Sequence, residues 1–149
     1  MEEKIVNMSL EEGALAEYRI LAIRPLPKVD PEKDLEWLCK SLGFLEPRDK
    51  KKTAFKILKL LLEAARENRG LTSDELAAKL SLTRGTMVHH LNKMIRSGLV
   101  IYHEGKYKLR GRSLKTTIEE AHRDINRIFE NLYKIAESID RAFNLFSRS

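Results

Sequence analysis

The sequence has little of the chemistry that cross-links a chain or holds a metal. Cys39 is its only cysteine, so no disulfide can form within one chain. A four-thiolate metal site would need ligands from other chains or of other types. A single cysteine fits a protein kept in a reducing compartment, and we expect a cytoplasmic location.

Glutamine is absent from the 149 residues, whereas Lys, Glu, Arg and Ile are abundant. This bias is typical of proteins from hyperthermophiles, in which labile amides are few and charge networks strengthen with heat. A hot-growing source is the hypothesis that follows.

Long apolar runs are also absent. The N-terminus has no basic stretch followed by an apolar core, and no run approaches the roughly 18 apolar residues of a membrane span. From the sequence we therefore expect a protein that is neither exported nor inserted into a membrane.

Recognisable catalytic patterns are missing as well. We find no paired carboxylates with a cleft signature, no glycine-rich phosphate loop and no Ser/His/Asp arrangement. The sequence therefore predicts no enzyme, no catalytic residues and no cofactor.

What the sequence does have is positive charge. Lys and Arg outnumber Asp and Glu by 28 to 22, and the sequence pI is about 9.5. Such a molecule attracts polyanions, which favours nucleic acid over acidic metabolites as a partner.

Residues 1–30 form an N-terminal extension to which the sequence assigns no function. Within it, Tyr18–Arg24 resembles a short strand that ends where two prolines follow. A helix is predicted next, because Asp30 and Pro31 form a good cap and first-turn pair, and leucines recur at helical spacing until Gly43.

A second helix is expected from about residue 47 to 68 and is interpreted as a scaffold. Lysines 50–52 lie in or near its first turn, where the helix dipole disfavours cations. Phosphate contact would explain that placement, although we favour a solvated charged face. The residues expected to be buried are Phe55, Leu58, Leu61, Leu62 and Ala65.

Two helix starts occur in quick succession between residues 71 and 98. Thr72 and Glu75 have the spacing of a capping box, and Thr83 caps the second helix, which Gly98 ends. A link as short as residues 80–82 holds consecutive helices at a steep angle, as in a DNA-binding helix-turn-helix.

The second of these helices, about residues 83–97, is the predicted recognition helix. Met87, Leu91 and Met94 face the core and leave a polar, hydrogen-bonding face opposite. The alternative is a surface helix of an all-α bundle. We expect base contacts from Arg84, Thr86 and His89, and backbone contacts from Thr83, Asn92 and Lys93.

Residues 99–110 predict a hairpin around a Glu-Gly turn. A two-residue turn places Tyr102 opposite Tyr107 and Val100 opposite Leu109, on one apolar face. This hairpin is the predicted wing, and its cations either contact phosphate, which we favour, or serve only solubility. They are His103, Lys106, Lys108 and Arg110.

The segment Met87–Val100, with its His-Leu pair and Ser-Gly-Leu helix end, and the following glycine-tipped hairpin resemble the ArsR-type winged-helix repressors of bacteria and archaea. MarR-like relatives share much of this pattern. The resemblance covers about residues 50–112. It implies a dimer that binds palindromic operators in double-stranded DNA and represses transcription, often releasing DNA when a metal or another signal binds.

The last segment, residues 113–149, contains no Gly or Pro and carries a heptad seam. A long helix with this seam predicts a homodimer, and the alternative is a helix folded back on its own domain. Whether the pair is parallel or antiparallel stays open. The seam residues are Leu114, Ile118, Ala121, Ile125, Ile128, Leu132, Ile135, Ile139, Ala142 and Phe146.

Some relatives bind metals through clustered cysteines on an early helix or through carboxylate and His ligands on the last helix. Here Cys39 stands alone, and His122 has no second His at ligand spacing. We therefore expect no metal site. A small-molecule effector held between the N-terminal extension and the long helices stays possible.

The predicted fold is mainly α with a small β-hairpin wing: a winged helix-turn-helix plus a long C-terminal dimerisation helix. Residues 1–30 form the extension, 31–112 the DNA-binding domain and 113–149 the dimerisation helix. A second function stays open, namely a winged-helix protein-interaction module of a larger assembly that binds no specific DNA.

Overall fold

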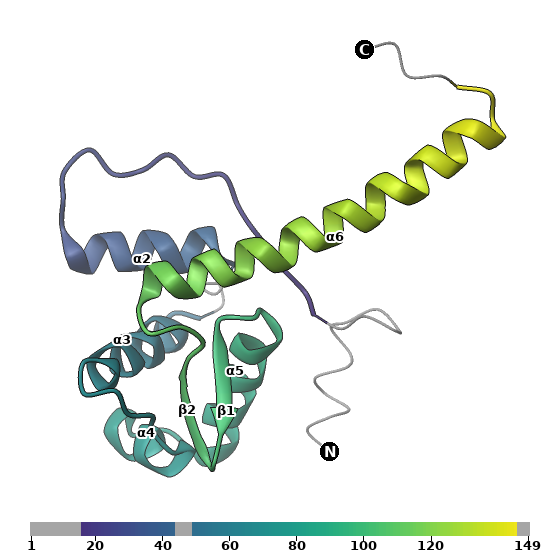
Figure 1. Ribbon diagram of the computed structural model, residues 1–149. Coiled ribbons are helices and arrows are strands. Elements are labelled where there is room, and N and C mark those ends of the chain that lie inside the picture. Colours follow the sequence, from purple (N-terminus) through teal and green to yellow (C-terminus); the bar gives the residue numbers. More distant parts are fainter. Residues whose placement is uncertain (1–15, 44–48, 146–149) are drawn as a thin grey trace.

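The computed structural model describes residues 16–43 and 49–145. It is mostly helical, with a two-stranded antiparallel hairpin that follows the fourth described helix. The last helix runs outward from the rest (Figure 1). The elements are α2 (Pro31–Ser41), α3 (Thr53–Ala65), α4 (Ser73–Leu80), α5 (Arg84–Arg96), β1 (Val100–His103), β2 (Lys106–Leu109) and α6 (Leu114–Ala142).

Three helix starts lie where capping chemistry predicted them. Asp30 accepts a hydrogen bond from the backbone N–H of Lys33 at the start of α2. Thr72 begins α4 with a complete capping box to Glu75. Thr83 begins α5 by accepting from the backbone N–H of Thr86 at 3.1 Å. Each side-chain oxygen satisfies a backbone donor that the helix itself cannot pair.

The start of α3 corrects the sequence prediction. The helix begins at Thr53, and the carboxylate of Asp49 accepts from the backbone N–H groups of Thr53 and Ala54 at 3.1 and 3.4 Å. Lysines 50–52 therefore precede the helix. The Asp49 carboxylate offsets the positive end of the helix dipole. Because the lysines lie before the helix, their positive charge no longer needs a phosphate contact to explain it.

The buried face of α3 agrees with the predicted one only in part, because Leu58 and Leu61 are buried as expected and three other residues are not. Phe55, Leu62 and Ala65 are only partly buried. The helix is rotated about its axis so that the residues next to them in the sequence face the core instead. The buried apolar side chains are Ala54, Ile57, Leu58, Leu61 and Ala64.

The core lies between α3, α4, α5 and the hairpin. Met87, Leu91 and Met94 of α5 are buried, as their helical spacing predicted. Leu76 of α4 and Val100 of β1 are buried with them in the same cluster. The core therefore fixes which face of α5 remains outside.

The hairpin has the predicted register, with Tyr102 opposite Tyr107 and Val100 opposite Leu109. Glu104 and Gly105 both have positive φ, 52° and 80°, as a two-residue primed turn requires. Leu71 adds a bridge that the sequence did not predict. Its backbone N–H and carbonyl pair with Tyr107 at 2.9 and 2.7 Å, which anchors β2 to the start of α4.

The N-terminal segment from residue 16 to 30 contains no strand, contrary to the prediction for Tyr18–Arg24. It is held by isolated contacts. The backbone N–H of Glu17 donates to the carbonyl of Arg96 at 3.2 Å, and that of Leu21 donates to the carbonyl of Ser41 at 2.7 Å. The segment thus connects the end of α5 with the end of α2.

Helix α6 has 29 residues and is therefore about 43 Å long. It ends at Ala142, earlier than the sequence predicted. Its first turns pack on the domain, where Thr117 and Ala121 are buried. The remainder projects away from the domain (Figure 1). Phe146, a predicted seam residue, lies outside the described residues.

Candidate nucleic-acid interface

A three-residue link sets the relation between α4 and α5. Ser81 adopts the left-handed conformation with φ of 54°, and the backbone N–H of Leu82 donates to the carbonyl of Ala77 at 3.0 Å. Thr83 follows as the cap of α5. A link this short leaves the second helix little freedom relative to the first.

The three predicted base-contact residues lie on the exposed side of α5. Arg84, Thr86 and His89 are exposed, and the Arg84 side chain retains 72% of its accessible surface. They occupy the first half of the helix. The structure therefore brings together, within two turns, a guanidinium, a hydroxyl and an imidazole on the outer side of the domain.

The predicted backbone contacts on α5 are less uniform. Thr83 is exposed, but its hydroxyl is committed to Thr86, since the two hydroxyls hydrogen-bond at 2.9 Å. Asn92 and Lys93 lie farther along the helix and are half-buried. The Thr83 hydroxyl thus already caps α5, and any contact with phosphate would be made in addition to these hydrogen bonds.

Three of the residues predicted to contact phosphate lie on the outer side of the hairpin. His103 and Lys106 flank the turn and are exposed, while Lys108 is half-buried. The turn lies at the end of the domain opposite α6 (Figure 1). Tyr102, expected on the covered apolar face, is 58% exposed, and its ring lies 4.7 Å from that of Tyr107. An exposed aromatic side chain is therefore a further contact candidate on the wing.

Arg110 differs from the other cations of the hairpin. Its guanidinium is largely covered and donates to Asp124 at 2.5 Å and to the carbonyl of Gly98 at 3.3 Å. Glu120 lies 3.5 Å from its Nε. The structure thus gives Arg110 a role inside the molecule, joining β2 to α6, and we omit it from the phosphate contacts.

Two acidic side chains lie beside the exposed cations. Asp74 is 3.8 Å from Arg84, and Glu104 is 3.5 Å from His103. All four side chains are mostly solvent-exposed, so these pairs are weak and readily exchanged for a phosphate or a base. Their presence lowers the local positive potential without blocking the surface.

Within the described ranges, no group of three His, Cys, Asp or Glu residues could hold a metal ion. Cys39 is buried, and burial raises the pKa of its thiol to about 12. No helix within residues 16–43 and 49–145 is long and apolar enough to cross a membrane.

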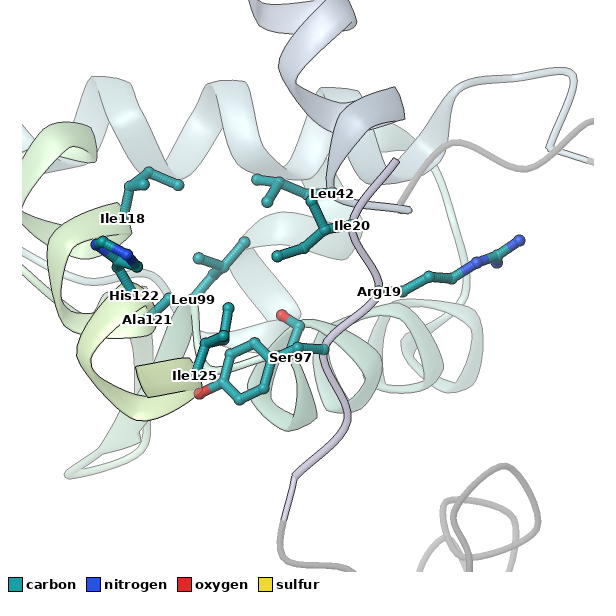
Figure 2. Close-up of a pocket in the computed structure, with 10 residues that line it drawn as sticks. Arg19, Ile20, Leu42, Ser97, Leu99, Ile118, Ala121, His122 and Ile125 are labelled. Atoms are coloured by element: carbon teal, nitrogen blue, oxygen red, sulfur yellow. The ribbon is translucent and has the colours of Figure 1, made fainter. Parts of the chain in front are cut away.

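An apolar pocket of about 230 Å³ lies where the N-terminal segment passes α6 (Figure 2). Tyr18 and Ile20 of the N-terminal segment line one side and α6 lines another, and Leu42, Ser97 and Leu99 complete the lining. The sequence left open an effector bound between the N-terminal extension and the long helices, but it did not indicate which residues would line the site. On the α6 side the lining residues are Ile118, Ala121, His122 and Ile125.

Two helices joined by a tight link, with a hairpin directly after them, define a helix-turn-helix domain with a hairpin in the position of a wing. A family model described as a helix-turn-helix domain matches residues 51–103, which span α3 to β1. Neither the curated proteins nor the solved structures gave a match. The chain thus contains a helix-turn-helix domain, which indicates a DNA-binding regulator.

Proposed function

We propose that the protein is a sequence-specific regulator that binds double-stranded DNA as a homodimer and represses transcription, in the manner of ArsR-type winged-helix proteins. Helix α5 enters the major groove, and the hairpin β1–β2 lies along the phosphate backbone. The observation that carries this proposal is the exposed cluster of Arg84, Thr86 and His89 on the first half of α5.

The chemistry of this cluster fits base recognition. An arginine can donate two parallel hydrogen bonds to the N7 and O6 atoms of guanine, and a threonine can contact either a base edge or a thymine methyl group. Recognition helices use their N-terminal residues in this way, because that end of the helix reaches deepest into the groove. Lys106 and His103 lie on the neighbouring hairpin, where contacts to phosphate fix the register.

The projecting part of α6 supports the dimer. Ile128, Leu132, Ile135 and Ile139 expose between 42 and 61% of their surface along one helix face. A row of exposed large apolar residues of this length is typical of an association surface. A second copy would supply a second α5, and two recognition helices match two half-sites about 34 Å apart.

The proposal is tested by selecting binding sites from random-sequence duplexes with the full-length protein, followed by sequencing. We expect enrichment of a palindrome. Arg84→Ala combined with His89→Ala should lose the enrichment at both low and moderate salt. Lys134→Ala is the matched control, because it removes an exposed cation from the projecting part of α6 and should select the same palindrome.

A second candidate is a protein-interaction module, which the exposed apolar surface of α6 favours. It predicts weak binding with no enriched sequence, equal for the wild type and the α5 variant. That result would contradict the regulator and leave the dimer surface as the functional part.

A further inference from the structure

Helix α6 consists of two parts that share one apolar stripe. Up to Ile125 the stripe faces the domain, where Ala121 is 7% exposed. From residue 126 to Ala142 every residue is exposed. The free part is about 17 residues long, or about five turns.

The stripe of the free part mixes large and small side chains in an uneven order. Leu132 and Ile135 lie near its middle, Phe129 and Ala136 flank them, and Ala142 ends the helix. Resting on the homodimer proposed above, we propose that α6 pairs antiparallel with α6 of a second copy, with Leu132 of one chain opposite Ile135 of the other.

This register pairs Leu132 with Ile135 and Ile128 with Ile139 at the centre, and matches a large residue with a small one toward the ends. Antiparallel pairing brings each core position of one helix against the other core position of its partner. Ile125 then meets Ala142 of the second copy, and at the flanking positions Phe129 lies beside Ala136. Interiors pack most favourably when large and small side chains face one another, because voids and overlaps are both costly.

The same register fits the length of the free helix. The pair Leu132 and Ile135 lies midway between Ile125, where the domain stops covering α6, and Ala142, where the helix ends. The two free parts therefore overlap completely. Each helix ends where it would otherwise meet the partner domain.

Other arrangements fit less well. Moving the antiparallel register by one heptad sets Phe129 against itself in one direction and Ala136 against itself in the other. A parallel pair sets Ala142 against itself and places Phe129 beside Asp124, a carboxylate already bound to Arg110. Each of these leaves a void, a crowded pair or an apolar ring against a charge.

Antiparallel pairing also brings the second copy to the apolar pocket. Phe143, which directly follows α6 and is 72% exposed, falls level with His122 of the partner. In Figure 2, His122 and Ile125 lie on the α6 side of that pocket. Phe143 of the second copy therefore covers the pocket mouth, and dimerisation buries the apolar lining that the monomer leaves open.

Disulfide trapping tests the arrangement in the full-length protein. Ala142→Cys and Ile125→Cys are each made alone, and the two are also co-expressed with different tags. The native Cys39 is fully buried and does not interfere. In the antiparallel register, two copies of residue 142 lie about 26 Å apart along the axis, far beyond disulfide distance.

We expect a covalent dimer only from the co-expressed pair, and none from either variant alone. Glu137→Cys, on the outer face of α6, is the control and should stay uncoupled. A covalent dimer of Ala142→Cys alone means parallel pairing and overturns the proposal, as does a dimer by sedimentation with no coupling in any combination. A monomer by sedimentation overturns the homodimer itself. DNA selection by the Arg84 variant is measured separately, so failure of the pairing and failure of DNA recognition are distinguishable.

Discussion

Arg110 and Asp124 form a short ion pair, with 2.5 Å between Nη1 and Oδ2, at the point where three parts of the chain meet. The Tyr18 hydroxyl donates to the same carboxylate oxygen at 2.7 Å, and Arg127 binds its other oxygen. The end of β2, the N-terminal segment and α6 are thus joined through one side chain. Asp124 therefore links α6 directly to the residue that follows β2.

The first prediction concerns the pH dependence of stability. The hydrogen bonds from Arg110 and Tyr18 hold the pKa of Asp124 down to about 2. A carboxyl group with a lowered pKa stabilises the fold at pH values above about 4, the pKa that it has in the unfolded chain. It loses that contribution as pH falls toward 2. Asp124→Asn should therefore lower the free energy of unfolding by about 1 kcal/mol at pH 7, allowing for partial exposure, and by almost nothing near pH 2.

Urea unfolding of both proteins between pH 2 and 7 measures this difference. Glu137→Gln, on the exposed outer face of α6, is the control and should match the wild type throughout. A difference that stays the same at pH 2 and pH 7 would mean that charge on Asp124 contributes nothing.

The second prediction compares two glycines. Gly98 has a φ of 81°, and a Cβ there would lie 2.5 Å from the Tyr18 hydroxyl oxygen. Gly98→Ala should therefore lower the free energy of unfolding by about 2 kcal/mol, through backbone strain and displacement of Tyr18. Gly85, inside α5, has no atom within 4 Å of such a Cβ, so Gly85→Ala should raise stability by about 0.5 kcal/mol. Thermal unfolding of both variants measures the two changes in stability. Equal changes at the two positions would contradict the close approach of Tyr18 to Gly98.

The third prediction concerns the turn of the hairpin. Glu104 holds a φ of 52°, a conformation that asparagine tolerates better than glutamate. Glu104→Asn should raise the free energy of unfolding by about 0.5 kcal/mol. Glu104→Ala removes the same charge but lacks the conformational preference, so it should give no gain in the same unfolding experiment. If both variants gain equally, charge rather than backbone conformation is the cause.

The fourth prediction concerns the single thiol. Burial raises the pKa of Cys39 to about 12, so at pH 8 the reactive thiolate is about a thousandfold scarcer than for an unperturbed cysteine. Labelling by a chromogenic disulfide reagent should be at least that much slower in the native protein than in urea. Rapid labelling without denaturant would place Cys39 at the surface.

The helix caps and the hairpin register could be predicted from the sequence because they depend on neighbours in the chain. Thr72 and Thr83 each cap a backbone N–H three residues away, and the Glu-Gly turn sets every pair of the hairpin. The exposed face of α5 followed from the helical spacing of Met87, Leu91 and Met94. These local rules also located the base-contact candidates.

Contacts between distant segments could not be predicted in this way. Arg110 has the same charge and position as a wing cation, and only its distance to Asp124 identifies it as part of the interior. The bridge from Leu71 to Tyr107 joins two segments that share no pattern. For α6, the heptad seam predicted an apolar stripe, but which part of it the domain covers depends on how the domain folds.

The most direct test of DNA recognition is a binding titration by fluorescence anisotropy, with the selected duplex and a scrambled duplex at several salt concentrations. Arg84→Ala should reduce the preference for the selected duplex by roughly tenfold, with the salt dependence little changed. Lys106→Ala should weaken binding to both duplexes equally and reduce the slope of log affinity against log salt by about one. If the wild type binds both duplexes alike, or if Arg84→Ala leaves the preference intact, then α5 does not read the sequence of DNA.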